Sequence, residues 1–165
     1  MTGPLQRAAG RVYGENGWPA TELDDGSGFT LYIEGSEGAW SALALTDDDA
    51  HTFVFYSLAP VDAPPDGTDR MAEYLHRANH GLVSATFEFA YGTGEVRLRS
   101  GIELGTLPAE LLTDDDMLQS LILDLSAANV GIFERYLSGI IAITLGDVSP
   151  AEIIGDIEGP IAELG

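Results

Sequence analysis

In the first half of the chain, apolar and polar positions alternate in short runs. Phe29, Leu31 and Ile33 alternate with Thr30, Tyr32 and Glu34, which is the period of a half-buried strand. A turn at 35–38 leads to a run over 39–45 in which both alternating sets are apolar or small. The next run, 51–58, holds four consecutive apolar residues at 53–56. It predicts a strand inside the sheet, covered on both faces.

A hairpin is predicted around Gly92-Thr93. A two-residue type II′ turn prefers glycine at its first central position. In that register every cross-strand pair is chemically matched. Two apolar pairs lie on one side and two polar pairs on the other: Phe89–Val96 and Phe87–Leu98, then Glu88–Arg97 and Thr86–Arg99.

Apolar spacings of three and four residues predict the helices. One covers about 4–13 and a second covers 68–79. A long helix begins at a capping box formed by Thr113 and Asp116 and ends at Gly146. A second capping box, Ser149-Pro150-Ala151-Glu152, starts a short terminal helix.

The pattern as a whole predicts an α+β fold in which helices cover an antiparallel sheet of about five strands. The predicted order is α-β-β-β-α-β-β-α, with the terminal helix added. No repeat or low-complexity linker interrupts the 165 residues, a length typical of one domain. We therefore expect a single domain over 1–165, with its core at about 28–146 and the terminal helix at about 149–163.

The charge balance narrows the classes of partner. There are 27 acidic residues against 7 basic ones, giving a net charge of −20, and every basic residue is Arg. Nucleic acids and anionic membranes would be repelled, because both are bound largely through Lys and Arg. The acidic surface either keeps the protein soluble, forms a docking face for basic partners, or reflects adaptation to high salt, since Lys is absent.

Localisation and membrane insertion are judged from the absence of certain residues and segments. With no cysteine, disulfides, thiol chemistry and cysteine-based metal sites are excluded. The first residues show no secretory signal pattern, and the most apolar stretch, about 130–145, carries Glu134 and Arg135 and is too short to span a bilayer. We expect a cytoplasmic protein.

Few residues suggest chemistry. His76 and His80 are four residues apart, a spacing that allows metal binding with Glu73 as third ligand, although a histidine near a helix end is favourable without any metal. The acidic clusters at 46–49 and 113–116 lack EF-hand spacing and are explained as a turn and a helix cap. Because no nucleophile elbow or phosphate loop is present, we expect no catalytic residues, cofactor or bound metal.

The long helix carries more apolar positions than one buried face requires. The additional residues lie beside the main stripe and must be covered by something. Either the terminal and N-terminal helices cover them, or they form a surface for a homodimer or a client protein: Leu121, Phe133, Leu137 and Ile141.

Several stretches, taken in order, resemble the YbjN family of bacterial proteins. They are the aromatic strand 51–57, the helix that ends in Asn79 before Gly81, the hairpin strands 86–89 and 94–99, and a long helix with Tyr136 near its middle that runs into 145–152. The family is often labelled a sensory transduction regulator, and its fold is similar to that of type III secretion chaperones. The resemblance implies a helix-covered antiparallel sheet and a non-enzymatic role. Those chaperones bind extended segments of client proteins and are commonly homodimers.

The sequence thus leads to one hypothesis and two alternatives. The hypothesis is a chaperone-like or regulatory module that binds a protein partner or client segment, with acidic residues favouring basic or amphipathic clients. One alternative is a small-ligand-binding protein or hydrolytic enzyme that uses His76 and Glu73. The other is a structural protein that only self-associates.

Overall fold

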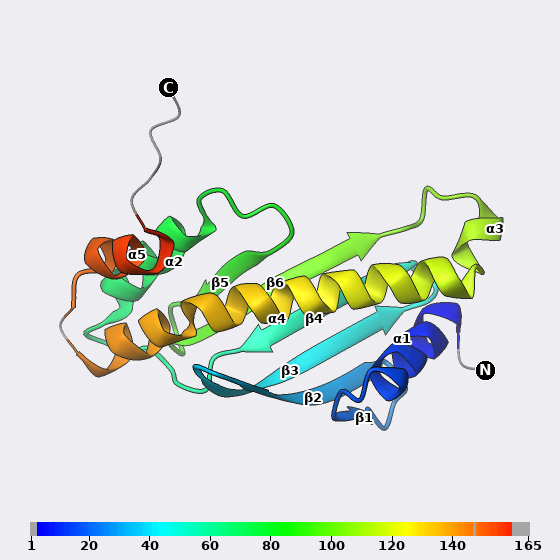
Figure 1. Cartoon of the computed structure of the whole chain (residues 1–165), viewed down its shortest axis with the longest axis horizontal. Coiled ribbons are helices and arrows are strands. Elements are labelled where there is room, and N and C mark those ends of the chain that lie inside the picture. The colour runs from blue at the N-terminus through cyan, green and yellow to red at the C-terminus, as the bar shows by residue number, and fades with distance from the viewer. Residues whose placement is uncertain (1–2, 147, 160–165) are drawn as a thin grey trace.

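A computed structural model describes residues 3–146 and 148–159 of the chain. Its elements alternate between helices and antiparallel strands (Figure 1). They are α1 (Pro4–Glu15), β1 (Ala20–Glu22), β2 (Gly28–Gly35), β3 (Gly38–Asp47), β4 (Thr52–Leu58), α2 (Thr68–Asn79), β5 (Thr86–Ala90), β6 (Glu95–Glu103), α3 (Ala109–Leu112), α4 (Asp115–Leu145) and α5 (Pro150–Glu158).

The strands form one antiparallel sheet in the order β1-β2-β3-β4-β6-β5. This confirms the predicted α+β class and the order of elements. Two short elements were not anticipated. The three-residue strand β1 makes the sheet six-stranded, and α3 is a single turn before the long helix. Both are too short to give a periodic apolar signal.

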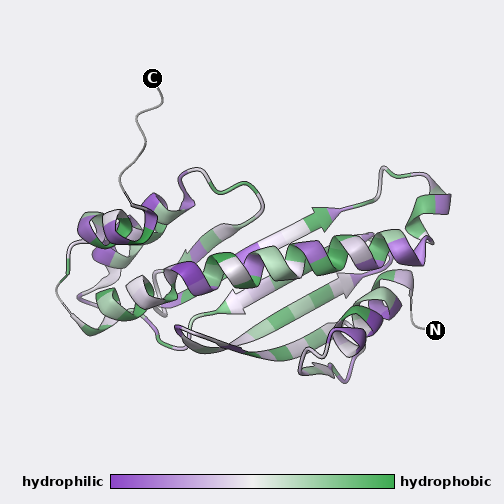
Figure 2. Ribbon diagram, in the orientation of Figure 1, coloured by the Kyte–Doolittle hydropathy of each residue, from purple (hydrophilic) through white to green (hydrophobic). Residues whose placement is uncertain are grey.

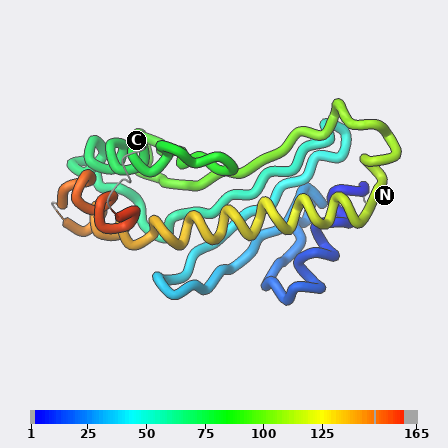
Figure 3. Tube along the Cα trace, turned by 45° about the horizontal axis from the view of Figure 1, so that its top comes forward, coloured from blue at the N-terminus to red at the C-terminus, as the bar shows by residue number. Residues whose placement is uncertain are grey.

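All the helices lie on one side of the sheet, and α4 runs along it for most of the molecule's length (Figures 1 and 3). The amino-terminal half of α4 packs beside α1, while its carboxy-terminal end packs with α2 and α5. Apolar positions follow β3, β4 and α4 in the hydropathy colouring (Figure 2). The sheet and α4 therefore enclose a continuous apolar layer.

That layer is divided into two clusters that α4 joins. One lies under α1 and includes Phe29, Phe53 and Phe55; the other lies under α2 and includes Trp40 and Phe133. Between them, the fully buried Asn129 of α4 makes polar contacts with β4 and β6. Both clusters include residues of α4, so this helix links the part of the molecule under α1 to the part under α2.

The helix boundaries confirm most of the predicted signals and correct one. Asp114, rather than Thr113, is the N-cap of α4, because its side chain accepts the Met117 N–H at 3.0 Å. The Thr113 hydroxyl instead donates to the Glu110 carbonyl at 3.2 Å, within the unpredicted turn α3. Ser149 caps α5 as expected. Residues 160–163 of the predicted terminal helix lie outside the described residues.

The β5–β6 hairpin has the predicted register and a different turn. All four predicted cross-strand pairs are present. The left-handed residue is Gly94 (φ 79°), while Gly92 is not in that region. Gly94 N–H donates to the Ala90 carbonyl at 2.8 Å, so Ala90 and Glu95 are joined by the four-residue loop 91–94. The predicted type II′ turn is therefore wrong: Gly94 takes the left-handed conformation, and its carbonyl accepts the Ala63 N–H at 2.8 Å.

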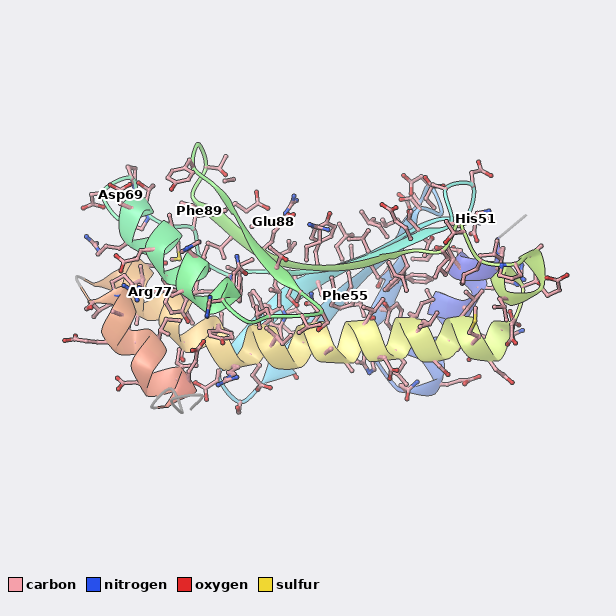
Figure 4. All side chains as sticks on the ribbon, turned by 90° about the horizontal axis from the view of Figure 1, so that it is seen from above. His51, Phe55, Asp69, Arg77, Glu88 and Phe89 are labelled. Atoms are coloured by element: carbon pink, nitrogen blue, oxygen red, sulfur yellow. The ribbon has the colours of Figure 1, made fainter. Side chains whose placement is uncertain are left out.

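Strand β4 lies inside the sheet, as predicted, but it is not covered on both faces. Phe53, Phe55 and Ser57 are buried, whereas Val54, Tyr56 and Leu58 on the other side are only partly buried. Figure 4 shows Phe55 between the sheet and α4, while Glu88 projects from the opposite side, over which no helix lies. The apolar run predicted a second covering layer, which residues 3–146 and 148–159 do not supply.

Candidate functional site

The apolar surface predicted on the long helix is largely used inside the subunit. Phe133 and Leu137 are fully buried in the core, so the prediction that they lie on a protein-binding surface is wrong. Leu121 and Ile141 are partly buried and pack against different core clusters. Phe133 faces the sheet, with its ring centroid 5.2 Å from that of Trp40 on β3 and 6.3 Å from that of Phe87 on β5. Leu137 lies near Gly38 of β3, so the sheet covers both residues.

The His76 and His80 pair gives no sign of a metal site. Glu73, the predicted third ligand, instead pairs with Arg77, whose Nε donates to it at 2.9 Å. His80 terminates α2 as its C-cap. Over residues 3–146 and 148–159, no group of three His, Asp or Glu side chains is placed to hold a metal ion.

The acidic cluster at 46–49 has the structural role that the sequence suggested. Asp47 accepts the Ala50 N–H at 2.8 Å and closes the turn after β3. Asp48 reaches the start of α1, where it accepts the Leu5 N–H at 2.7 Å. Asp47 and Asp48 thus accept hydrogen bonds from backbone N–H groups, and the N–H that Asp48 accepts is at the N-terminus of a helix.

Three tyrosine hydroxyls connect the helices. Tyr74 of α2 donates to the Tyr136 carbonyl of α4 at 2.8 Å, and Tyr136 donates to Glu158 of α5 at 2.7 Å. Burial raises the pKa of Tyr136 to about 12, with a further contribution from Glu158. Burial likewise raises the pKa of Tyr74, and that of Tyr13, which bonds Ser126 at 3.1 Å. These groups stay protonated and serve packing rather than proton transfer.

A groove of about 440 Å³ lies at the outer edge of the sheet, between β2, α4 and the α1–β1 connection. Trp18 and Val130 supply part of its apolar wall, and Trp18 is held by stacking on Tyr13, with ring centroids 5.7 Å apart. We call it the edge groove; its lining residues are Gly17, Trp18, Pro19, Tyr32, Ile33, Glu34 and Val130.

The backbone beside the edge groove is unpaired on its outer side. Strand β1 pairs only with residues 29–31 of β2, although β2 continues to Gly35. Tyr32 N–H still donates to the Pro19 carbonyl at 3.3 Å. Because antiparallel strands direct alternate residues to alternate neighbours, the N–H and C=O of Glu34 point the same way, beyond the end of β1. Strand β2 thus offers a short free edge next to an apolar groove.

The opposite edge of the sheet is blocked. Asn79, at the end of α2, accepts the Phe87 N–H at 2.7 Å and donates to the Phe87 carbonyl at 3.1 Å. Its side-chain amide therefore replaces a neighbouring strand on β5. Protection of one edge is a common way to prevent unwanted strand pairing, and here it covers β5 at Phe87.

The uncovered side of the sheet is a second candidate surface, which we call the open face. Its centre is apolar, because Leu43 pairs with Tyr56 and Leu45 pairs with Val54 across β3 and β4. Leu58 extends the same strip. Next to it on β6 lie Arg97, Arg99, Gly101 and Glu103.

The arginines of the open face share one carboxylate. Arg97 and Arg99 each donate through Nε to Glu88 at 2.6 Å, and the Arg97 guanidinium lies 4.7 Å from the centre of the Tyr56 ring. Partial burial alone would raise the pKa of Glu88, but the bonds from Arg99 and Arg97 outweigh it and hold this pKa below its ordinary value. Two positively charged guanidinium groups thus share one carboxylate at this place, although the protein is strongly acidic overall.

Sequence reasoning missed both surfaces as sites. For the open face a signal existed, since both alternating sets of residues 39–45 and 51–58 are apolar. For the edge groove there was none, because Trp18 and Pro19 stand in a stretch that reads as an irregular connection.

In residues 3–146 and 148–159, no helix is long and apolar enough to cross a membrane.

Comparison with known proteins places the arrangement of elements among solved structures. No protein-family model matches the sequence, and no curated protein matches it. The structure is similar to that of the ExsC–ExsE complex, with 16% identity, a TM-score of 0.42, and coverage of 83% of this chain and 96% of the other. It is also similar to YbjN from E. coli, with 12% identity, a TM-score of 0.45, and coverage of 74% and 92%.

Proposed function

We propose that this chain is a single-domain, non-enzymatic protein-binding module of the bacterial cytoplasm, which captures an extended apolar segment of another protein in the edge groove. The observation that supports this most is the combination of a free strand edge and an apolar groove at one place. Main-chain bonds to a strand edge give affinity, and pockets for alternate side chains give specificity.

The proposed segment would lie antiparallel or parallel to β2 beyond the end of β1. Its backbone would bond with the N–H and C=O of Glu34, and its inward side chains would fill the space between Trp18 and Val130. Apolar burial would supply most of the affinity. Glu34 and the net charge of −20 favour a segment with Lys or Arg at its ends, because complementary charge steers association.

A pair of substitutions at one position tests this mode of binding. Glu34→Pro removes the N–H that points away from the sheet. The hydrogen bonds between β2 and β3 stay intact, because Glu34 and Ala39 face each other as a pair whose backbone groups do not bond to each other. Proline is tolerated at such an edge position. Glu34→Gln is the matched control, since it removes the charge and keeps the backbone donor.

The probes are synthetic peptides of alternating Val and Thr with either Lys or Glu at both ends, measured by fluorescence anisotropy. We expect the Lys-flanked peptide to bind and Glu34→Pro to weaken it by about tenfold, which is about 1.4 kcal/mol. Glu34→Gln should have a smaller effect that disappears at high salt. Equal binding of both peptides, or unchanged binding to Glu34→Pro, would contradict the proposal.

The natural partner can then be identified in cells. A photo-cross-linking amino acid at position 34 should capture it, while the same amino acid at position 124, an exposed site on α4, should not. Capture at both positions alike would show that the edge groove is not the binding site.

A further inference from the structure

The open face has a pattern of residues that is complementary to itself. Across β3, β4 and β6 its side chains form rows perpendicular to the strands. From one end of the strands to the other, the rows are Ser41–Leu58–Arg97, Leu43–Tyr56–Arg99, Leu45–Val54–Gly101 and Asp47–Thr52–Glu103. The two central rows are mostly apolar, and the outer rows end in opposite charges on β6.

We propose that two copies of this chain stack open face to open face, about a two-fold axis that lies between the two central rows and perpendicular to the strands. This interface is formed by β3, β4 and β6 and adjoins the edge groove at Tyr32, which pairs with Ser41; it goes beyond the proposed function. The two-fold axis turns the second copy so that its rows run in the opposite order. The first row of one copy therefore lies on the fourth row of the other, and the second row lies on the third. Two sheets that pack in this way lie about 10 Å apart, with side chains interleaved between them.

The central rows supply apolar contacts in this arrangement. Leu43 meets Leu45 of the second copy, and Tyr56 meets Val54 of the second copy, each pair occurring twice. Arg99 faces Gly101 of the second copy, an exposed position without a side chain, so its long side chain fits without a clash. The open face would thus gain the covering layer that the apolar composition of β3 and β4 predicts.

The outer rows supply the charge complementarity. Arg97 of one copy faces Glu103 of the other, again twice. Arg97 shares Glu88 with Arg99, so one carboxylate balances two guanidinium groups and a second carboxylate is favourable there. Although each copy carries a net charge of −20, charges more than about 8–10 Å apart are largely screened at physiological salt.

Charge reversal provides a specific test. Arg97→Glu alone places two like-charged pairs at the two-fold interface, and so does Glu103→Arg alone, so each variant should dimerise about tenfold more weakly or worse. When the two variants are mixed, both charge pairs become attractive. Native mass spectrometry of the mixture, with one variant carrying a mass tag, should therefore show a heterodimer.

Two further variants complete the experiment. Leu43→Glu should abolish the dimer, because it buries a carboxylate between apolar residues, and circular dichroism checks that its fold is intact. Asp124→Arg changes an exposed charge on α4, on the helical side of the sheet, and should leave the dimer unchanged. A monomeric wild-type protein, a dimer that survives Leu43→Glu, or a mixture that forms no heterodimer would each overturn the proposal. Since the peptide assay at the edge groove does not depend on the dimer, the two proposals can fail separately.

Discussion

At the scale of single residues, the centre of the molecule depends on a buried polar side chain. Asn129 is completely buried in α4, and its Oδ1 accepts from the Ser57 hydroxyl at 2.8 Å. Its Nδ2 donates to Ser100 at 3.0 Å and to the Leu98 carbonyl at 3.2 Å. Ser57 in turn accepts from Trp40 at 3.1 Å. Every buried polar group here has a partner, so the network fixes the position of α4 on the sheet.

We therefore expect Asn129→Ala to lower the free energy of unfolding by about 2–4 kcal/mol, because it leaves buried donors and acceptors unpaired and opens a small cavity. Urea titration followed by circular dichroism measures the effect. Ser138→Ala is the matched control at an exposed site of the same helix and should change stability by less than about 0.5 kcal/mol. Equal stability of the two variants would show that the network contributes little.

The residue scale also shows where prediction from sequence ends. Asn129 lies among the buried residues of α4, at a position that the three- and four-residue apolar spacing reaches. That spacing cannot show the partners of Asn129, which come from strands about 30 and about 70 residues away in sequence. Asp114 replaced the predicted Thr113 as N-cap for a similar reason. Both residue types cap well, and the choice depended on a turn, α3, that has no periodic signal.

At the scale of elements, the predictions held where the apolar pattern alone decides the structure. The register of β5 and β6 follows from matched pairs and was correct, while the turn depends on a contact between Gly94 and Ala63 from a distant loop. The helices were found by their spacing. What covers each residue was not found, because the spacing does not show that Phe133 faces Trp40 and Phe87 of the sheet.

The junction of α4 and α5 should be sensitive to alkaline pH. The pKa of Tyr136 is raised from its ordinary value near 10 to about 12, so the folded state retains its phenolic proton where the unfolded state has released it. The contribution to stability is therefore complete below pH about 10 and is lost as the pH rises towards about 12. Tyr136→Phe removes this titration, and the variant should lose less stability over that range than the wild type.

Urea midpoints at pH about 9 and about 11 measure this difference, with near-ultraviolet absorbance following tyrosinate formation. A residual loss is expected in the variant, because Tyr74 and Tyr13 also have raised pKa values. If wild type and variant lost stability in parallel, the titration of Tyr136 would not be the cause of the loss at alkaline pH.

At the scale of the whole molecule, charge opposes folding while the apolar layer drives it. Ion pairs at the surface include Arg11 with Asp115, Arg77 with Glu73, and Arg97 and Arg99 with Glu88. The full chain has 27 acidic residues and 7 basic ones, so there are too few basic side chains to pair with most of the carboxylates. A high net charge destabilises the compact state through self-repulsion, and salt screens that repulsion.

We therefore expect the melting temperature to rise as NaCl is added, most steeply at low salt and then more slowly as the Debye length falls below the spacing of surface charges. A variant with Asp124→Asn, Asp156→Asn, Glu15→Gln and Glu37→Gln, four exposed positions, removes part of the repulsion without touching either proposed surface. Its melting temperature should start higher and rise less with salt. Differential scanning calorimetry of both proteins at several salt concentrations gives the comparison. If the two curves were parallel, the acidic surface would not limit stability, and its excess charge would instead be explained by the partners it attracts.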